Sequence, residues 1–235
     1  LPIYNNTAAL ITGEGTTLTI TGDSSSYGGS FGGTVTVDYT GGGTFTLGNS
    51  DKTVALTPAA SADATLKISS GTLSLFSGNV NWSQKLVMGD GTTLTVQDGP
   101  AVSGYYNYDA TSINGDGFTF SGAATFGTGV NLTTQYGKNI KFTGVLTAAS
   151  GFSISGADSE YTYYTLTGTE NQIGGTIAIT RNSTSLGINA SGSLGTAAVT
   201  TSSGSQYLTY YGTAGEAADV IDNSITGAGN FVAQS

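Results

Sequence analysis

The sequence predicts an all-β protein built as a parallel β-helix, or β-solenoid, in which successive coils of chain stack on one another. Very short runs with alternating polar and apolar residues occur along most of the 235 residues. Gly, Asn, Asp and Ser separate these runs, and these residues turn a chain most readily. One eight-residue stretch also occurs twice, as GEGTTLTI at 13–20 and GDGTTLTV at 89–96. Internal repetition of this kind identifies stacked architectures.

Each strand-like run is short and has one apolar face. In TLTI at 17–20, Leu18 and Ile20 share a face, and threonines occupy the other. We expect the apolar residues to stack inside the coil, the threonines to form outer ladders, and the flanking glycines and acid to turn the chain. In chain order, the predicted strands are 17–20, 34–37, 44–47, 53–56, 65–68, 72–75, 85–88, 93–96, 139–142, 152–154 and 176–179.

The spacing of the runs predicts the size of a coil. Most runs begin 7 to 13 residues apart, so three strands would make a coil of roughly 25–30 residues, and about eight coils would form a rod roughly 40 Å long. This spacing alone also fits a β-sandwich or an antiparallel barrel. The very short strands and an I-x-G-x-G pattern at 11–15, 113–117 and 225–229 favour the solenoid. We therefore expect residues 1–235 to form one β-helical segment, with pseudo-repeats opening near residues 11, 113 and 225.

Composition excludes several kinds of function. The chain has no His and no Cys, which excludes Ser-His-Asp and Cys-His nucleophiles and makes a zinc site improbable. Fifteen acidic and six scattered basic residues give a net charge of −9, so nucleic acid is not an expected partner. No apolar run reaches the ~20 residues needed to span a membrane. A polar surface of Ser, Thr, Asn and Gly with only 9% charged residues is common in exported bacterial surface proteins.

Several ordered motifs are similar to a known family. LTITGD at 18–23 followed by SYGG at 26–29 resembles the "LTLTG…YTGGT" core of the passenger-associated repeats of bacterial autotransporters. Later, LTG at 166–168, IGGT at 173–176 and SLGTAAV at 193–199 follow the family's order "LTG…TGGT…LGTGAV", and VIDNSITGAG at 220–229 resembles the opening of such a repeat. The resemblance covers about 11–50 and 160–232, and residues 97–150 depart from it.

The resemblance implies a right-handed parallel β-helix that is secreted to the surface of a Gram-negative cell through a C-terminal β-barrel. Amphipathic barrel strands are absent from this sequence, so membrane attachment is expected only through a barrel that these 235 residues do not contain. The chain is then expected to be a segment of a longer passenger.

Tyrosines are the most suggestive side chains for binding. Three runs, YYNY at 105–108, YTYY at 161–164 and YLTYY at 207–211, place adjacent tyrosines on opposite faces of an extended chain, so at least one of each pair should face outward. Exposed tyrosine favours contact surfaces and stacks on sugars, whereas filling of the core is the alternative. The predicted ligand-binding residues are Tyr105, Tyr106, Tyr108, Asp109, Tyr161, Tyr163 and Tyr164.

Acidic residues give a second set of candidates. Asp109, Asp116, Asp158 and Glu160 could cleave a polysaccharide, because glycoside hydrolysis needs two facing carboxyl groups. Acids beside Gly and Asn are more often turn residues on a solvated surface. The GDG stretches at 89–91 and 115–117 lack the dense acidic spacing of known calcium loops, so no metal or other cofactor is expected.

Three hypotheses of function follow. The first is a non-enzymatic cell-surface adhesin segment that binds identical passengers on neighbouring cells, or host matrix and glycans, in aggregation and biofilm formation. The second is a polysaccharide-cleaving β-helix that uses the acids above. The third is a filament subunit assembled by strand addition between chains.

Overall fold

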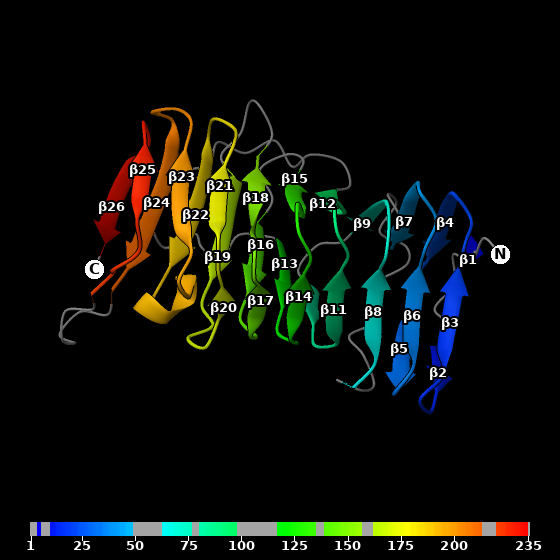
Figure 1. Ribbon diagram of the computed structural model, residues 1–235. Coiled ribbons are helices and arrows are strands. Elements are labelled where there is room, and N and C mark those ends of the chain that lie inside the picture. Colours follow the sequence, from blue (N-terminus) through cyan, green and yellow to red (C-terminus); the bar gives the residue numbers. More distant parts are fainter. Residues whose placement is uncertain are drawn as a thin grey trace.

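The computed structural model describes residues 4–5, 10–48, 63–76, 80–97, 117–134, 139–156, 162–212 and 220–234. They form an all-β parallel solenoid of about eight turns, with about 22 residues per turn, which confirms the predicted fold class. Figure 1 shows the strands side by side in a row, with the two termini at opposite ends. The hand of the coil stays a prediction.

Three faces run along the solenoid, and neighbouring strands within each face are parallel. Sheet A has ten strands in the order β1-β4-β7-β9-β12-β15-β18-β21-β23-β25. Its strands are β1 (Tyr4–Asn5), β4 (Ser24–Tyr27), β7 (Thr44–Leu47), β9 (Thr72–Phe76), β12 (Thr93–Gln97), β15 (Asn131–Thr134), β18 (Gly151–Ser155), β21 (Thr176–Ile179), β23 (Ala198–Thr201) and β25 (Ile225–Gly227).

The other two faces are sheet C and sheet D, and a small sheet B pairs β2 with β5. Sheet C contains β3 (Thr17–Ile20), β6 (Thr36–Tyr39), β8 (Thr65–Ile68), β11 (Lys85–Met88), β14 (Ala124–Phe126), β17 (Leu146–Ala148) and β20 (Gln172–Ile173). Sheet D contains β10 (Val80–Trp82), β13 (Gly117–Phe120), β16 (Asn139–Phe142), β19 (Thr162–Leu166), β22 (Thr184–Ile188), β24 (Gln206–Tyr211) and β26 (Asn230–Gln234), and sheet B contains β2 (Leu10–Gly13) and β5 (Ser30–Gly33). A short 3-10 helix, η2 (Ser191–Leu194), follows β22.

Sheet B continues the face formed by sheet D. The ring of Phe31 in β5 meets the ring of Trp82 in β10 edge-on, with centroids 5.8 Å apart. The Gln84 side-chain amide also donates a hydrogen bond to the Phe31 carbonyl oxygen. The solenoid therefore has three faces of strands from its first described turns to β20, the last strand of sheet C, and only sheets A and D continue beyond it.

The predicted coil of 25–30 residues is too long. Thr72 pairs with Thr93, 21 positions later, and Asn131 pairs with Ser153, 22 positions later. Thr93, in contrast, pairs with Asn131, 38 positions later, and the register of the ladder is nonetheless kept. The length of the step therefore varies from turn to turn, while the pairing register persists.

The repeated eight-residue stretch marks a turn and a strand, and not a fixed place in the coil. Its first copy ends in β3 of sheet C, and its second ends in β12 of sheet A. The second glycine of each copy, Gly15 or Gly91, has a positive φ, near 60° in both cases, as a turn of this type requires. The I-x-G-x-G pattern behaves likewise, because Ile11 lies in sheet B and Ile225 in sheet A. Each face needs a tight turn followed by a short strand with one apolar side, so similar short sequences occur on different faces.

The core consists of apolar side chains stacked in register along the inside of the coil. Leu94 pairs with Leu73 in the preceding turn and with Leu132 in the next, and all three are buried, as is Val96. The rings of Phe120 and Phe142 stack with centroids 5.0 Å apart. Burying a side chain of this size stabilises the fold by about 1.5–3 kcal/mol. The inward positions predicted for the second repeat are confirmed.

Ile20 of the first repeat is also buried, whereas Leu18 is partly exposed because β3 is the last strand in the described order of sheet C. The exposed large apolar residues of the described part all lie in the first or last turns, and they are Leu10, Leu18, Val220, Ile225 and Phe231.

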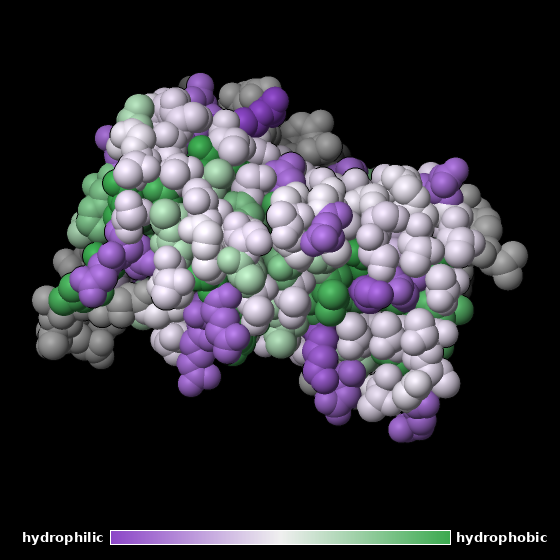
Figure 2. Space-filling model, viewed as in Figure 1, coloured by the Kyte–Doolittle hydropathy of each residue, from purple (hydrophilic) through white to green (hydrophobic). Residues whose placement is uncertain are grey.

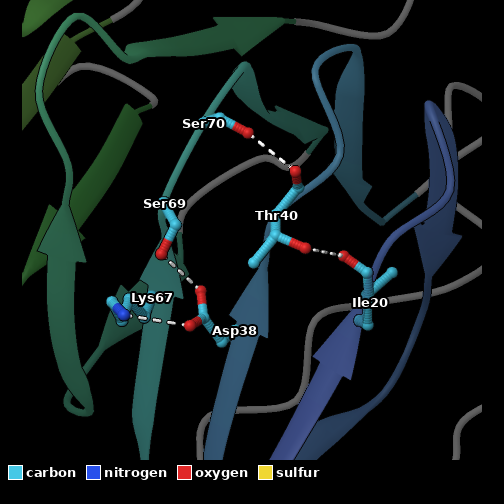
Figure 3. Close-up of polar contacts among 6 residues, drawn as sticks. All are labelled: Ile20, Asp38, Thr40, Lys67, Ser69 and Ser70. Carbon is cyan, nitrogen blue, oxygen red and sulfur yellow. Dashed lines mark hydrogen bonds and ion pairs between the residues drawn. The ribbon is translucent and has the colours of Figure 1, made fainter.

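Polar side chains tie successive turns together at the corners (Figure 3). Asp38 in β6 accepts hydrogen bonds from Lys67 Nζ at 2.9 Å and from Ser69 Oγ at 2.7 Å, both in the next turn. Ser70 Oγ donates to the Thr40 carbonyl oxygen at 2.8 Å. Because the Lys67 side chain is 42% exposed, its ion pair with Asp38 contributes at most about 1 kcal/mol. These contacts fix the register of neighbouring turns more than they add to stability.

One buried amide bridges three turns. Asn171, which is 7% exposed, accepts a hydrogen bond from the Leu146 backbone N–H at 2.8 Å through Oδ1. Its Nδ2 donates to the Ser193 carbonyl oxygen in η2 at 2.9 Å. Elsewhere in the solenoid, backbone groups form hydrogen bonds between successive turns. Between β17 and η2, the Asn171 side chain forms such bonds instead.

Candidate functional site

The structure describes only part of the predicted set of binding residues. Tyr163 and Tyr164 lie in β19. The other predicted ligand-binding and acidic residues lie outside the described ranges, and they are Tyr105, Tyr106, Tyr108, Asp109, Asp116, Asp158, Glu160 and Tyr161.

Tyr164 points into the core. It is 1% exposed, and its hydroxyl lies 2.6 Å from the Ser155 carbonyl oxygen and 3.1 Å from the Leu132 carbonyl oxygen. Burial raises the pKa of this hydroxyl far above its usual range, although the nearby hydrogen-bonding groups act in the opposite direction. The ring of Tyr164 therefore fills the core, the alternative that the sequence left open, and is not accessible at the surface.

We expect Tyr164→Phe to lower the free energy of unfolding by about 1–3 kcal/mol at neutral pH, because the hydroxyl proton that the Ser155 and Leu132 carbonyl oxygens share is lost. The pH dependence should change as well. A pKa that is higher in the folded state gives stability that is complete below pH 10 and is lost as the pH rises above 10. Urea unfolding at several pH values from 8 to 11 should show a shallower decline for the variant than for the wild type.

The decline should not vanish in that variant, because burial also raises the pKa of Tyr27 and that of Tyr39. Tyr207→Phe, at a partly exposed ring, is the matched control and should leave both stability and its pH dependence close to those of the wild type. An unchanged profile for Tyr164→Phe would contradict the assignment of Tyr164 as a buried, protonated donor.

Tyr163 belongs to the outer surface of sheet D, where the register brings it close to other tyrosines. Tyr163 pairs with Ser185, and Ser185 pairs with Tyr207. Tyr211 extends from the same strand as Tyr207, four positions later. We refer to Tyr163, Tyr207 and Tyr211 as the tyrosine face. All three are partly exposed.

Small side chains lie between these rings. Ser185 and Thr209 are 2% and 6% exposed, and their hydroxyls lie 3.3 Å apart. Gly187 adjoins Tyr211 closely, because a Cβ atom at this glycine would lie 2.8 Å from Cε2 of the tyrosine ring. Position 187 thus leaves room for the Tyr211 ring against the sheet.

Sheet A presents a different outer surface, a continuous polar ladder. Neighbouring members pair directly from turn to turn, and every member is partly or fully exposed. We refer to this row as the sheet A ladder, and its members in order are Ser24, Thr44, Thr72, Thr93, Asn131, Ser153, Ala178, Thr200 and Thr226. Eight of these nine positions carry a hydroxyl or an amide. Within the ladder, Ser153 Oγ donates to Asn131 Oδ1 at 2.8 Å.

A second polar row runs beside this ladder and is less accessible. It passes through Ser26, Thr46, Ser74, Thr95, Thr133 and Ser155, and Ser74 and Thr95 are buried.

The described strands of sheet A contain no charged residue, whereas sheet C carries Asp38, Lys67 and Lys85, and sheet D carries Lys141. Figure 2 shows residues of intermediate hydropathy over most of the visible side of the molecule, with strongly hydrophilic residues in separate groups. The sheet A ladder is therefore an uncharged surface of hydrogen-bonding groups repeated once per turn.

The described acids form no cluster suited to a metal ion. Within the ranges given above, no three of the Asp and Glu side chains come together as metal ligands would. Asp90, in one of the GDG stretches, accepts a hydrogen bond from the Thr128 backbone N–H at 2.7 Å, which is the role of a turn residue. Among the described residues, no helix has the length and apolar character needed to cross a membrane.

Comparisons with protein-family models, with curated proteins and with solved structures gave no match for this chain.

Proposed function

We propose that this chain is an adhesive segment of a bacterial cell-surface rod, of the passenger type that its motifs resemble, exported by a Gram-negative cell. Its role is to hold identical rods together side by side, as in cell aggregation and biofilm formation. The observation that carries the proposal is the sheet A ladder, an exposed polar row without charges that extends over nine strands.

Repetition makes such a ladder suited to self-association. Neighbouring strands lie about 4.8 Å apart, so two rods share the same spacing and can align their rows step by step. A hydrogen bond between exposed groups contributes only about 0.5–1.5 kcal/mol. One such contact cannot offset the free-energy cost of association, which is about 4–15 kcal/mol. Several contacts in register can do so, and a surface that displays many rods multiplies the effect.

Charge distribution supports the same conclusion. A net charge of −9 makes the whole chain repel its copies, but the described strands of sheet A carry none of that charge. Contact through sheet A therefore brings two rods together along the face where like-charge repulsion is weakest. Added salt should strengthen the association moderately, because it screens the remaining repulsion.

The test places charge on one face at a time. Thr72→Lys combined with Thr93→Lys puts two cations in the centre of the sheet A ladder, and these should repel the same cations on a partner rod. We expect wild-type protein to self-associate in sedimentation experiments and displayed protein to clump cells, and we expect this double variant to do neither.

Thr125→Lys combined with Thr147→Lys is the matched control, because these paired threonines occupy the outer face of sheet C. This control should associate as the wild type does. The proposal would be ruled out if purified wild-type protein stays monomeric at high concentration and cells that display it never clump.

A further inference from the structure

We propose that the tyrosine face of sheet D binds a neutral polysaccharide. This surface lies on a different sheet from the sheet A ladder, so the inference does not depend on the association of rods. Three kinds of observation carry it: the alignment of the rings, the small residues beneath them and the lack of charge among the described residues paired around them.

The rings are aligned across the strands of the solenoid. Tyr163 and Tyr207 occupy the same outer row with Ser185 between them, so their Cα atoms lie about 10 Å apart, two strand spacings. That separation is too wide for a single sugar ring to be held between the two tyrosine rings. The two tyrosines would instead contact different units of an extended sugar chain. Tyr211, further along β24, adds a third ring. Several rings in a row favour a polymer over a single sugar.

Small residues also lie beneath the Tyr211 ring and between the other two. Thr165, Ser185 and Thr209 are outward-facing residues of sheet D, yet all three are buried. Gly187, which pairs with Thr165 and Thr209, adjoins the edge of the Tyr211 ring. A ring held against small residues loses little further freedom when a ligand binds, so more of the contact energy appears as affinity.

The chemistry of the surface selects a neutral sugar. The apolar face of a tyrosine ring packs against the C–H face of a pyranose, and tyrosine hydroxyls and the exposed Asn230 beside Tyr207 can hydrogen-bond to sugar hydroxyls. Residues paired around the rings (Thr165, Ser185, Gly187, Thr209 and Asn230) are all uncharged. Lys141 is the nearest cation in the same rows, one strand beyond Thr165. A single lysine on a chain of net charge −9 does not make a site for an acidic polymer.

The experiment measures retention of the purified chain by immobilised polysaccharides, namely cellulose, mannan and starch as neutral polymers and polygalacturonate and heparin as acidic ones. We expect retention by at least one neutral polymer. Tyr207→Ala should weaken that binding at least about tenfold, as expected for a central aromatic contact. Tyr207→Phe keeps the ring and should bind within a few-fold of the wild type. Gly187→Ala should weaken binding by displacing the Tyr211 ring.

Self-association of the same variants keeps the two proposals apart. Tyr207→Ala should still sediment as the wild type does, which also shows that it is folded, and Thr72→Lys with Thr93→Lys should still bind the polymer. Failure of every neutral polymer to retain the chain would overturn the inference. So would unchanged binding by Tyr207→Ala, or a preference for the acidic polymers.

Discussion

Gly151→Ala is expected to destabilise the protein by at least about 4 kcal/mol, which is the range of severe single substitutions. Gly151 begins β18 with φ of +74°, and it pairs with Thr176 in the next turn. A Cβ atom here would lie 1.9 Å from the Thr176 carbonyl oxygen and 2.5 Å from its carbonyl carbon. Because both neighbours are backbone atoms of the adjoining coil, no side-chain rotation can relieve the clash, and β18 and β21 must separate locally.

Gly91→Ala is the matched control for this prediction. Gly91 also has a positive φ, +66°, but a Cβ atom there would meet nothing within 4 Å. It should cost only the strain of the left-handed conformation, about 1–2 kcal/mol. The difference between the two variants therefore isolates the close approach of successive turns from the conformational freedom of glycine.

Urea unfolding gives the overall loss, and hydrogen exchange locates it. Stacked repeats often depart from two-state unfolding, so local opening is the more direct measure. Protection of the backbone amides in β18 and β21 should fall in Gly151→Ala and remain in Gly91→Ala. Equal losses of stability in the two variants would refute the steric explanation.

Asn171→Ala should have the next largest effect, a loss of roughly 2–6 kcal/mol in the free energy of unfolding. The substitution removes the buried side chain that forms the bridge and leaves the Leu146 N–H and the Ser193 carbonyl oxygen unpaired, and each such group costs about 1–3 kcal/mol. Asn171→Asp should also destabilise, because a carboxylate can accept from Leu146 but cannot donate to Ser193.

Gln172→Ala is the control, because it truncates an exposed side-chain amide at the adjacent position. Its stability should lie within about 0.5 kcal/mol of the wild type. The Leu146 amide should exchange faster in Asn171→Ala than in Gln172→Ala. Equal protection in the two variants would mean that the Asn171 bridge does not support the ladder.

Local pattern in the sequence predicted part of the strand set and the inward direction of the side chains in it, such as 93–96 within β12. It did not predict β15, β22 or β24, it placed one strand at 34–37 where β6 covers 36–39, and the predicted strand at 53–56 lies outside the described residues. Leu94 and Val96 alternate with Thr93 and Thr95, and the structure buries both apolar residues. The same reasoning could have assigned the tyrosines. Leu166 is buried two positions after Tyr164, so Tyr164 lies on the same inward side of its strand. Leu208 is buried next to Tyr207, so Tyr207 lies on the opposite, outward side.

Relations between turns were not predictable in this way. Tyr163 and Tyr207 share a row only because each of the two intervening steps is 22 positions long, as the pairing of Tyr163 with Ser185 and of Ser185 with Tyr207 shows. A coil estimated at 25–30 residues cannot give that alignment. Asn171 illustrates the same limit, since its partners lie 25 and 22 positions away in the sequence. Local alternation says nothing about contacts at such distances, which depend on the length of every connection.

The pairing of Thr93 with Asn131 has a wider consequence. The step from Thr93 to Asn131 is 17 positions longer than the step from Thr72 to Thr93, and the strands still pair in register. A solenoid of this design can thus gain or lose chain between β12 and β13 while its scaffold persists. We would therefore graft a foreign peptide for display between these two strands.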